Sequence, residues 1–217
     1  WSPELWQQIS IPKQISGLST ANEAKWQQQW PQLLAFKSGL HQVRRLMAHL
    51  PTYMIFDDHD VTDDWNLTAK WEEAAYGHAF SKRIIGNALI GYCLFQGLGN
   101  NPQVLIKQLG TELSDYFNES ADIDNKDKQQ EGLINQLLKF EQWHYSLNTS
   151  PKLVVLDTRT RRWRSESNFS KPSGLMDWEA LMEFQQSLVG EDKVIIVSPA
   201  PMYGVKAIEA IQRLATM

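Results

Sequence analysis

The chain contains the stretch Pro51-Thr-Tyr-Met-Ile-Phe-Asp-Asp-His-Asp60, in which an apolar run changes abruptly into ionisable residues. The apolar run, Tyr53 to Phe56, is short and follows a proline, a pattern that predicts a buried strand. Asp57, Asp58, His59 and Asp60 then stand where this strand would leave the core. Open α/β sheets bind their ligands at the carboxyl ends of strands. The stretch therefore predicts a functional site at the end of a strand.

Composition indicates an ordinary globular protein. The 217 residues are enough for one good-sized domain, or for a domain with a helical insert. A hydrophobic fraction of 42% and a charged fraction of 21% argue against a disordered or collagen-like chain. The net charge of −4 argues against a protein that binds nucleic acid mainly by neutralising phosphates. Most of the nine tryptophans are expected in the core or between helices.

Cys93 is the only cysteine, which excludes an internal disulfide framework and a zinc site built from cysteines. It is expected to be a small buried apolar residue. The most apolar long run, residues 84–99, is interrupted by Asn87 and Gln96 and falls short of the roughly 20 residues that a membrane span needs. The chain begins at Trp1 and is interpreted as an excerpt, so a cytoplasmic and an exported location both stay open.

Apolar periodicity and capping residues predict a chain rich in helices. A helical block is expected over residues 66–147, between two strands. The expected helices run from a cap at Ser19 or Thr20 to Pro31, from there to about His49, from a cap at Thr68 through Tyr92, from Val104 to Phe117, from Glu131 to Tyr145, and from Trp178, capped by Asp177, to Leu188. Residues 118–130 are polar without a period and are predicted to be a surface loop.

Two further strands are predicted from β-branched runs. The first is Lys152-Leu-Val-Val-Leu-Asp157, which continues as Thr-Arg-Thr-Arg-Arg162. The second is Lys193-Val-Ile-Ile-Val-Ser198, which continues as Pro-Ala-Pro201. Helices that alternate with buried strands predict a layered α/β fold.

These three stretches resemble the signatures of the PhoD-like (alkaline phosphatase D) metallophosphoesterases. The segment Phe56 to Trp65 is similar to the family's Asp-Asp-His-Glu-Val…Asn-Trp, with Asp60 in place of the usual Glu. The segment after residue 155 is similar to Leu-Asp-Thr-Arg-x-x-Arg, with Arg161 where many members have an aromatic residue, and the third strand ends in the family's Ser-x-x-Pro. The resemblance implies a fragment of a layered, calcineurin-like metallophosphoesterase core with a large helical portion, and residues 1–217 would be its central part.

The resemblance also implies a reaction, the hydrolysis of a phosphate mono- or diester by a metal-activated water. Iron and calcium or other divalent metals would be the cofactors. Eight residues receive roles in this way. They are Asp58 and Asp57 as metal ligands, His59 and Asp60 as the catalytic imidazole and its orienting carboxylate, Arg159 and Arg162 as substrate-binding residues, and Asp157 and Trp65 as supporting residues.

Other interpretations stay open. The acidic stretch could be a surface turn that caps the next helix, and Arg159 could form a structural ion pair with Asp57 or Asp157. The chain could also be a non-catalytic interaction module built on the helical block, or a phosphatase-like scaffold that has lost its metals. No Gly-Asp pair occurs, although the family's outer metal-binding motifs contain one, so these residues alone are not expected to build a complete two-metal site. Either the missing parts lie outside the excerpt, or the chain is a truncated piece with weak or no activity. An EF-hand is excluded, since Asp63 replaces the turn glycine and Ala69 the bidentate Glu.

Overall fold

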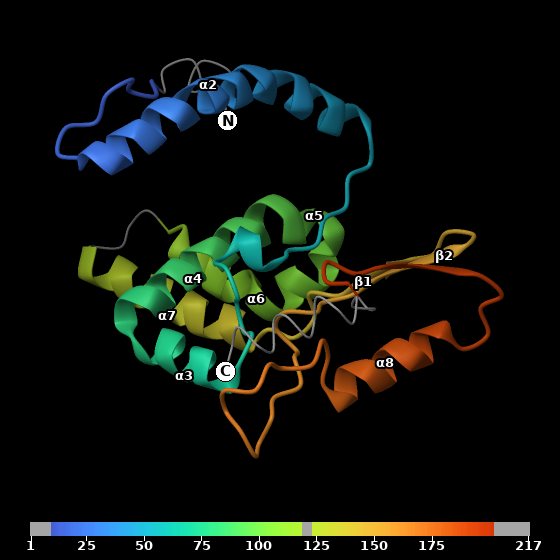
Figure 1. Cartoon of the computed structure of the whole chain (residues 1–217). Coiled ribbons are helices and arrows are strands. Elements are labelled where there is room, and N and C mark those ends of the chain that lie inside the picture. Colours follow the sequence, from blue (N-terminus) through green and yellow to red (C-terminus); the bar gives the residue numbers. More distant parts are fainter. Residues whose placement is uncertain (1–9, 119–122, 202–217) are drawn as a thin grey trace, which may run out of the picture. The chain divides into compact units, whose positions relative to one another are not determined.

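The computed structural model describes residues 10–118 and 123–201. The chain divides into two compact units, Trp1–Thr52 and Tyr53–Met217. Helices form most of the described residues, and one three-stranded sheet completes the second unit (Figure 1).

The first unit is built on one long helix, α2 (Thr20–His49). The side chain of Ser19 accepts a hydrogen bond from the backbone N–H of Asn22 and so caps the helix, as predicted. The predicted break at Pro31 is wrong, because α2 continues through this proline. The indoles of Trp26 and Trp30 donate to the carbonyls of Lys13 and Ile11, both at 3.2 Å. These bonds tie the preceding segment to the first turns of α2 and help to offset the hydrogen bond that a proline removes.

The helices of the second unit begin with α3 (Ala69–Gly77), which is capped by Thr68 as predicted. The predicted long helix is interrupted at His78, whose backbone is extended, and continues as α4 (Ala79–Tyr92). The remaining helices of this block are a π-helix (Cys93–Gly97), α5 (Leu98–Asn100), α6 (Pro102–Tyr116) and α7 (Ile123–Lys139). The last of them, α7, starts inside the predicted polar loop, because a helix that exposes one face to water can carry polar residues there. It ends before Tyr145, the predicted end of this helix.

The hydrophobic core joins Phe56 to α4, α6 and α7. Cys93 is fully buried in it, which confirms the prediction for this residue. Gly86 lets α4 approach α7 closely, since a Cβ atom at this position would lie 2.4 Å from Cγ1 of Ile134. The core therefore rests on helix contacts together with the apolar residue that directly precedes Asp57.

The sheet has the strand order β1-β2-β3. The strands are β1 (Tyr145–Leu147), β2 (Lys152–Val155) and β3 (Val194–Val197). The pair β1 and β2 is antiparallel, and β2 runs parallel to β3 with Val154 beside Ile196. The helix α8 (Trp178–Leu188), capped by Asp177 as predicted, connects β2 to β3 and lies along the sheet (Figure 1). Two of the predicted strands are thereby confirmed, whereas β1 was expected to be the end of a helix.

The predicted strand at Tyr53 to Phe56 is wrong, because these residues belong to no strand. Side chains satisfy the backbone of Met54 instead. Its N–H donates to Oδ1 of Asn100 at 3.1 Å, and its carbonyl accepts from Nδ2 of Asn100 at 2.6 Å and from the hydroxyls of Tyr92 and Tyr145 at 3.2 and 3.0 Å. A segment whose polar groups are satisfied in this way needs no neighbouring strand.

Candidate functional site

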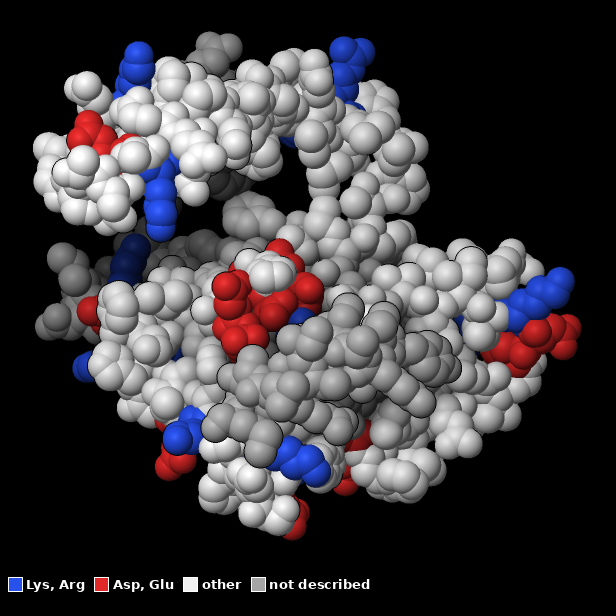
Figure 2. Space-filling view, viewed as in Figure 1, with Lys and Arg blue, Asp and Glu red and all other residues white. Residues whose placement is uncertain are grey.

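The acidic stretch forms a compact loop on the second unit. Asp58–Asp60 make one 3₁₀ turn, η1, directly after Asp57. The backbone N–H of Asp57 donates to Oδ2 of Asp60 at 2.9 Å, which closes the loop on itself. Five aspartates lie between positions 57 and 64, and Figure 2 shows acidic side chains gathered in a compact patch on this unit. This concentration of negative charge favours cations nearby, since like charges repel.

One such cation is Arg159, two residues beyond the buried Asp157 that follows β2. The carboxylate of Asp157 accepts from the backbone N–H of Arg159 at 2.8 Å and from that of Thr160 at 2.9 Å. In the resulting turn, Nε of Arg159 donates to Oδ1 of Asp57 at 2.8 Å, and Nη2 lies 3.0 Å from Oδ1 of Asp58. The structure thus brings together three predicted site residues from two distant segments. The sequence left an ion pair between Arg159 and Asp57 open, and the structure contains it.

His59 lies on the solvent side of this cluster, with 76% of its side chain exposed. Its Nδ1 is 2.9 Å from Oδ1 of Asp63, and its Nε2 is 4.0 Å from Oδ1 of Asp58. The hydrogen bond with Asp63, followed by the charge of Asp58, raises the pKa of His59 above its ordinary value. His59 therefore carries a proton to a higher pH than a free histidine does.

Asp57 and Asp157, which both contact Arg159, have opposite pKa shifts. Partial burial would raise the pKa of Asp57, but the backbone hydrogen bond from Asp58 and the hydrogen bond and charge of Arg159 outweigh it, so the pKa is lowered. Complete burial dominates at Asp157 and raises its pKa, although Thr160 and Arg159 donate hydrogen bonds to it. Asp57 is thus held as a carboxylate, whereas Asp157 takes up a proton more readily than an exposed aspartate.

Arg162 and Trp65 lie below the surface. Arg162 is only 5% exposed, and its Nη2 donates to the carbonyl of Ser173 at 2.9 Å. Burial and the neighbouring charge of Arg159 lower its pKa. Trp65 is packed against Phe56 with 5.1 Å between the ring centroids. Both side chains are therefore buried rather than facing solvent.

Sequence reasoning missed two residues that connect the loop to the turn at Arg159. Nε1 of Trp65 donates to the hydroxyl of Tyr76 at 3.0 Å, and this hydroxyl donates to Oδ1 of Asn66 at 2.6 Å. Nδ2 of Asn66 in turn donates to the carbonyl of Arg159 at 3.0 Å. Asn66 has a φ of 58°, in the left-handed region that asparagine tolerates better than most residues. The sequence signal that could have identified Asn66 was its position directly after Trp65, in a stretch rich in turn-forming residues.

The fit of this loop to a metal is partial. Aspartate oxygens are suitable ligands for hard divalent cations. However, residues 10–118 and 123–201 contain no group of three or more His, Cys, Asp or Glu side chains arranged to hold a metal ion. The described residues therefore offer ligands of a type that suits a metal, but they do not complete its coordination shell.

Comparisons with protein-family models, with curated proteins and with solved structures found no significant match to this chain. Within the described residues, no helix combines the length and the apolar character required to cross a bilayer.

Proposed function

We propose that the loop Asp57–Asp60 and Arg159 form part of a metal-dependent phosphoesterase site. The observation that carries the proposal is the junction of Asp57, Asp58 and Arg159 from two distant segments, beside an exposed histidine. The neighbouring aspartates raise the pKa of this histidine, and perturbed pKa values cluster at functional sites. The resemblance of three sequence stretches to PhoD-like enzymes supports the same function.

The charges of the loop suit the chemistry of a phosphoester. Asp57 and Asp58 are the proposed metal ligands, and a bound metal would supply a water of lowered pKa as the nucleophile. Arg159 fixes both carboxylates in place, which makes it a positioning residue. Further ligands would have to come from beyond the described residues, in agreement with the partial fit.

His59 is the proposed general acid. Its raised pKa keeps a larger share of the ring protonated near neutral pH, and its exposure lets a substrate approach. A protonated imidazole can donate a proton to the leaving alkoxide, which contributes about 10²–10⁴-fold to the rate of such reactions. Nδ1 of His59 is already engaged in the hydrogen bond with the carboxylate of Asp63. Nε2 is therefore the nitrogen proposed to face the substrate.

Metal content and hydrolysis of bis-p-nitrophenyl phosphate test the proposal. The wild-type protein, produced as the full-length parent that would supply the outer metal ligands, is compared with Asp58→Asn, His59→Ala and the control His78→Ala, which changes an exposed histidine at the start of α4. We expect Asp58→Asn to lose metal, and His59→Ala to keep metal but to lose about 10²-fold or more in rate. The control should match the wild type in both measurements. If the wild type holds no metal and all four proteins behave alike, the loop is structural, and an interaction module or a scaffold without metals replaces the enzyme.

A further inference from the structure

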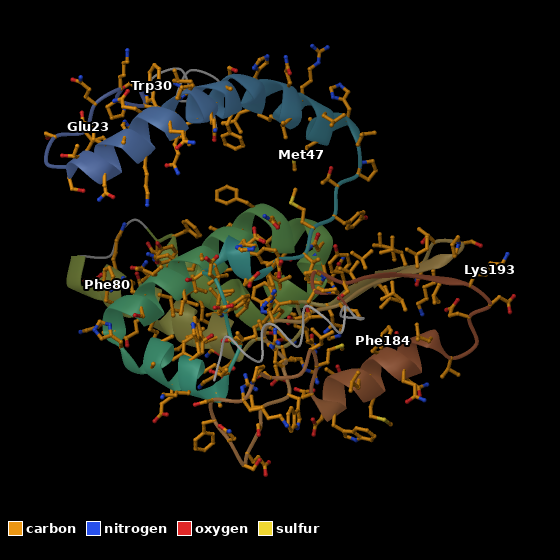
Figure 3. All side chains as sticks on the ribbon, viewed as in Figure 1. Glu23, Trp30, Met47, Phe80, Phe184 and Lys193 are labelled. Carbon is orange, nitrogen blue, oxygen red and sulfur yellow. The ribbon has the colours of Figure 1, made fainter. Side chains whose placement is uncertain are left out.

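A second feature of the same unit is a cavity between the sheet and α8. Its volume is ≈ 330 Å³, within the range of pockets that hold small molecules. Val154 and Leu156 form its wall on the side of β2, and Ala180 and Phe184 form its wall on the side of α8. Figure 3 shows Phe184 on the side of α8 that faces the sheet. None of the described residues that line the cavity belongs to the loop Asp57–Asp60.

One side chain that lines the cavity has a buried, unsatisfied donor. Arg161 lines it and is only 6% exposed. The guanidinium pairs through Nη1 with Glu183, and its Nη2 lies 3.7 Å from Oδ1 of Asp177. Its Nε is buried and has no hydrogen-bond partner within the described part of the chain. Buried donors in proteins are nearly always paired, so this N–H calls for an acceptor oxygen.

The two basic side chains that line the cavity, His144 and Arg161, both have an acidic partner, and the buried carboxyl group of Asp157, which also lines it, accepts from the backbone N–H groups of Arg159 and Thr160. Glu183 neutralises Arg161, and Nε2 of His144 lies 4.0 Å from Oε2 of the same glutamate. A ligand with a net charge would either compete with these pairs or leave its own charge uncompensated in a partly buried place, which is unfavourable. An uncharged ligand avoids this penalty. Phe184 and Met176 offer an aromatic face and a polarizable thioether, both of which favour an aromatic ring.

We propose that this cavity binds a small uncharged aromatic molecule whose carbonyl oxygen accepts the Nε–H of Arg161. The ring would lie against Val154, Leu156 and Phe184. A donor next to the carbonyl, such as an amide N–H, would reach Glu183. Asp157 lines this cavity and also holds the turn from which Arg159 extends, so the cavity adjoins the proposed phosphoesterase site. Its test does not depend on any hydrolytic activity.

Three probes of one shape and three charges test the proposal: benzamide, benzoate and benzamidine. Titrations are followed through the backbone amide signals of the isotope-labelled protein. We expect benzamide to shift the signals of Leu156, Ala180 and Phe184 in a saturable way. Benzoate and benzamidine should bind at least about fivefold more weakly, because each leaves a charge unpaired. Shifts that do not saturate, or equal affinity for all three probes, would overturn the proposal.

Three variants locate the binding. Ala180→Leu fills the cavity and should abolish the shifts caused by benzamide. Arg161→Met removes the Nε donor and should weaken benzamide at least about fivefold. Glu183 stays solvated in Arg161→Met, since 55% of its side chain is exposed. This variant therefore tests the hydrogen bond to Nε even if Ala180→Leu does not fold. Glu179→Gln, on α8 but outside the cavity, is the control and should bind benzamide as the wild type does. Unchanged binding to Arg161→Met would show that benzamide does not accept a hydrogen bond from Nε of Arg161 and would overturn the proposal.

Discussion

Nε of Arg159 donates to Oδ1 of Asp57 at 2.8 Å, although 102 residues separate the two in the chain. The same guanidinium contacts Asp58. The carboxyl group of Asp157 holds the backbone of the turn from which Arg159 extends. This contact connects the acidic loop to the end of β2, and the first prediction concerns its strength.

Replacement of Arg159 should destabilise the second unit. Arg159→Met leaves Asp57 and Asp58 without their shared cation, and we expect the free energy of unfolding in urea to fall by about 1–3 kcal/mol. Arg164→Met, which removes a more exposed pair with Glu72, should cost less than about 1 kcal/mol. The double variant with Asp57→Asn should lose less than the sum of the single changes. Strict additivity would mean that the contact does not form.

The buried carboxyl group of Asp157 should make stability depend on pH. Its pKa is raised in the folded state, so the protonated form favours folding. This contribution is complete below the ordinary aspartate pKa and is lost as the pH rises through the raised value. Asp157→Asn keeps an acceptor oxygen and cannot ionise. Relative to the wild type, the variant should therefore gain stability from pH 4 to pH 8 in urea unfolding, whereas parallel curves would contradict the raised pKa.

Asp63 should control the protonation of His59. The hydrogen bond with Asp63 is the largest cause of the raised pKa of His59, so Asp63→Asn should lower this pKa toward the ordinary histidine value. An NMR titration of the ring protons measures the change. Asp115→Asn, on α6, is the control. A pKa of His59 that is the same in Asp63→Asn as in the wild type would show that the hydrogen bond does not persist in solution.

The close approach of α4 and α7 can be tested with two glycines of one helix. Gly86→Ala would place a Cβ atom 2.4 Å from Ile134, and such overpacking typically costs about 1–3 kcal/mol. Gly91→Ala meets no atom within 4 Å and should be neutral or stabilising by up to ~1 kcal/mol through helix propensity. Thermal and urea unfolding of both variants give the comparison. If the clash is the cause, Ile134→Ala should cost less stability in the Gly86→Ala background than in the wild type.

Much of the fold was accessible from local patterns. Ser19, Thr68 and Asp177 cap helices as their side chains predict, because a cap depends on an oxygen and an N–H only two or three residues away. The β-branched runs after Lys152 and Lys193 form the predicted strands for a similarly local reason. The metallophosphoesterase core and the activity of the acidic loop stay predictions that the proposed experiments address.

The sequence by itself determined that Ser19, Thr68 and Asp177 cap helices, which runs form β2 and β3, and that ionisable residues gather at positions 57–60. Only the tertiary structure decided that Met54 uses side chains in place of a neighbouring strand, that Arg159 joins Asp57 and Asp58, and that a cavity opens beside Arg161. Caps and short-range periodicity act over a few residues. A contact across 102 residues depends instead on how the helices and the sheet pack, and no local pattern contains that information.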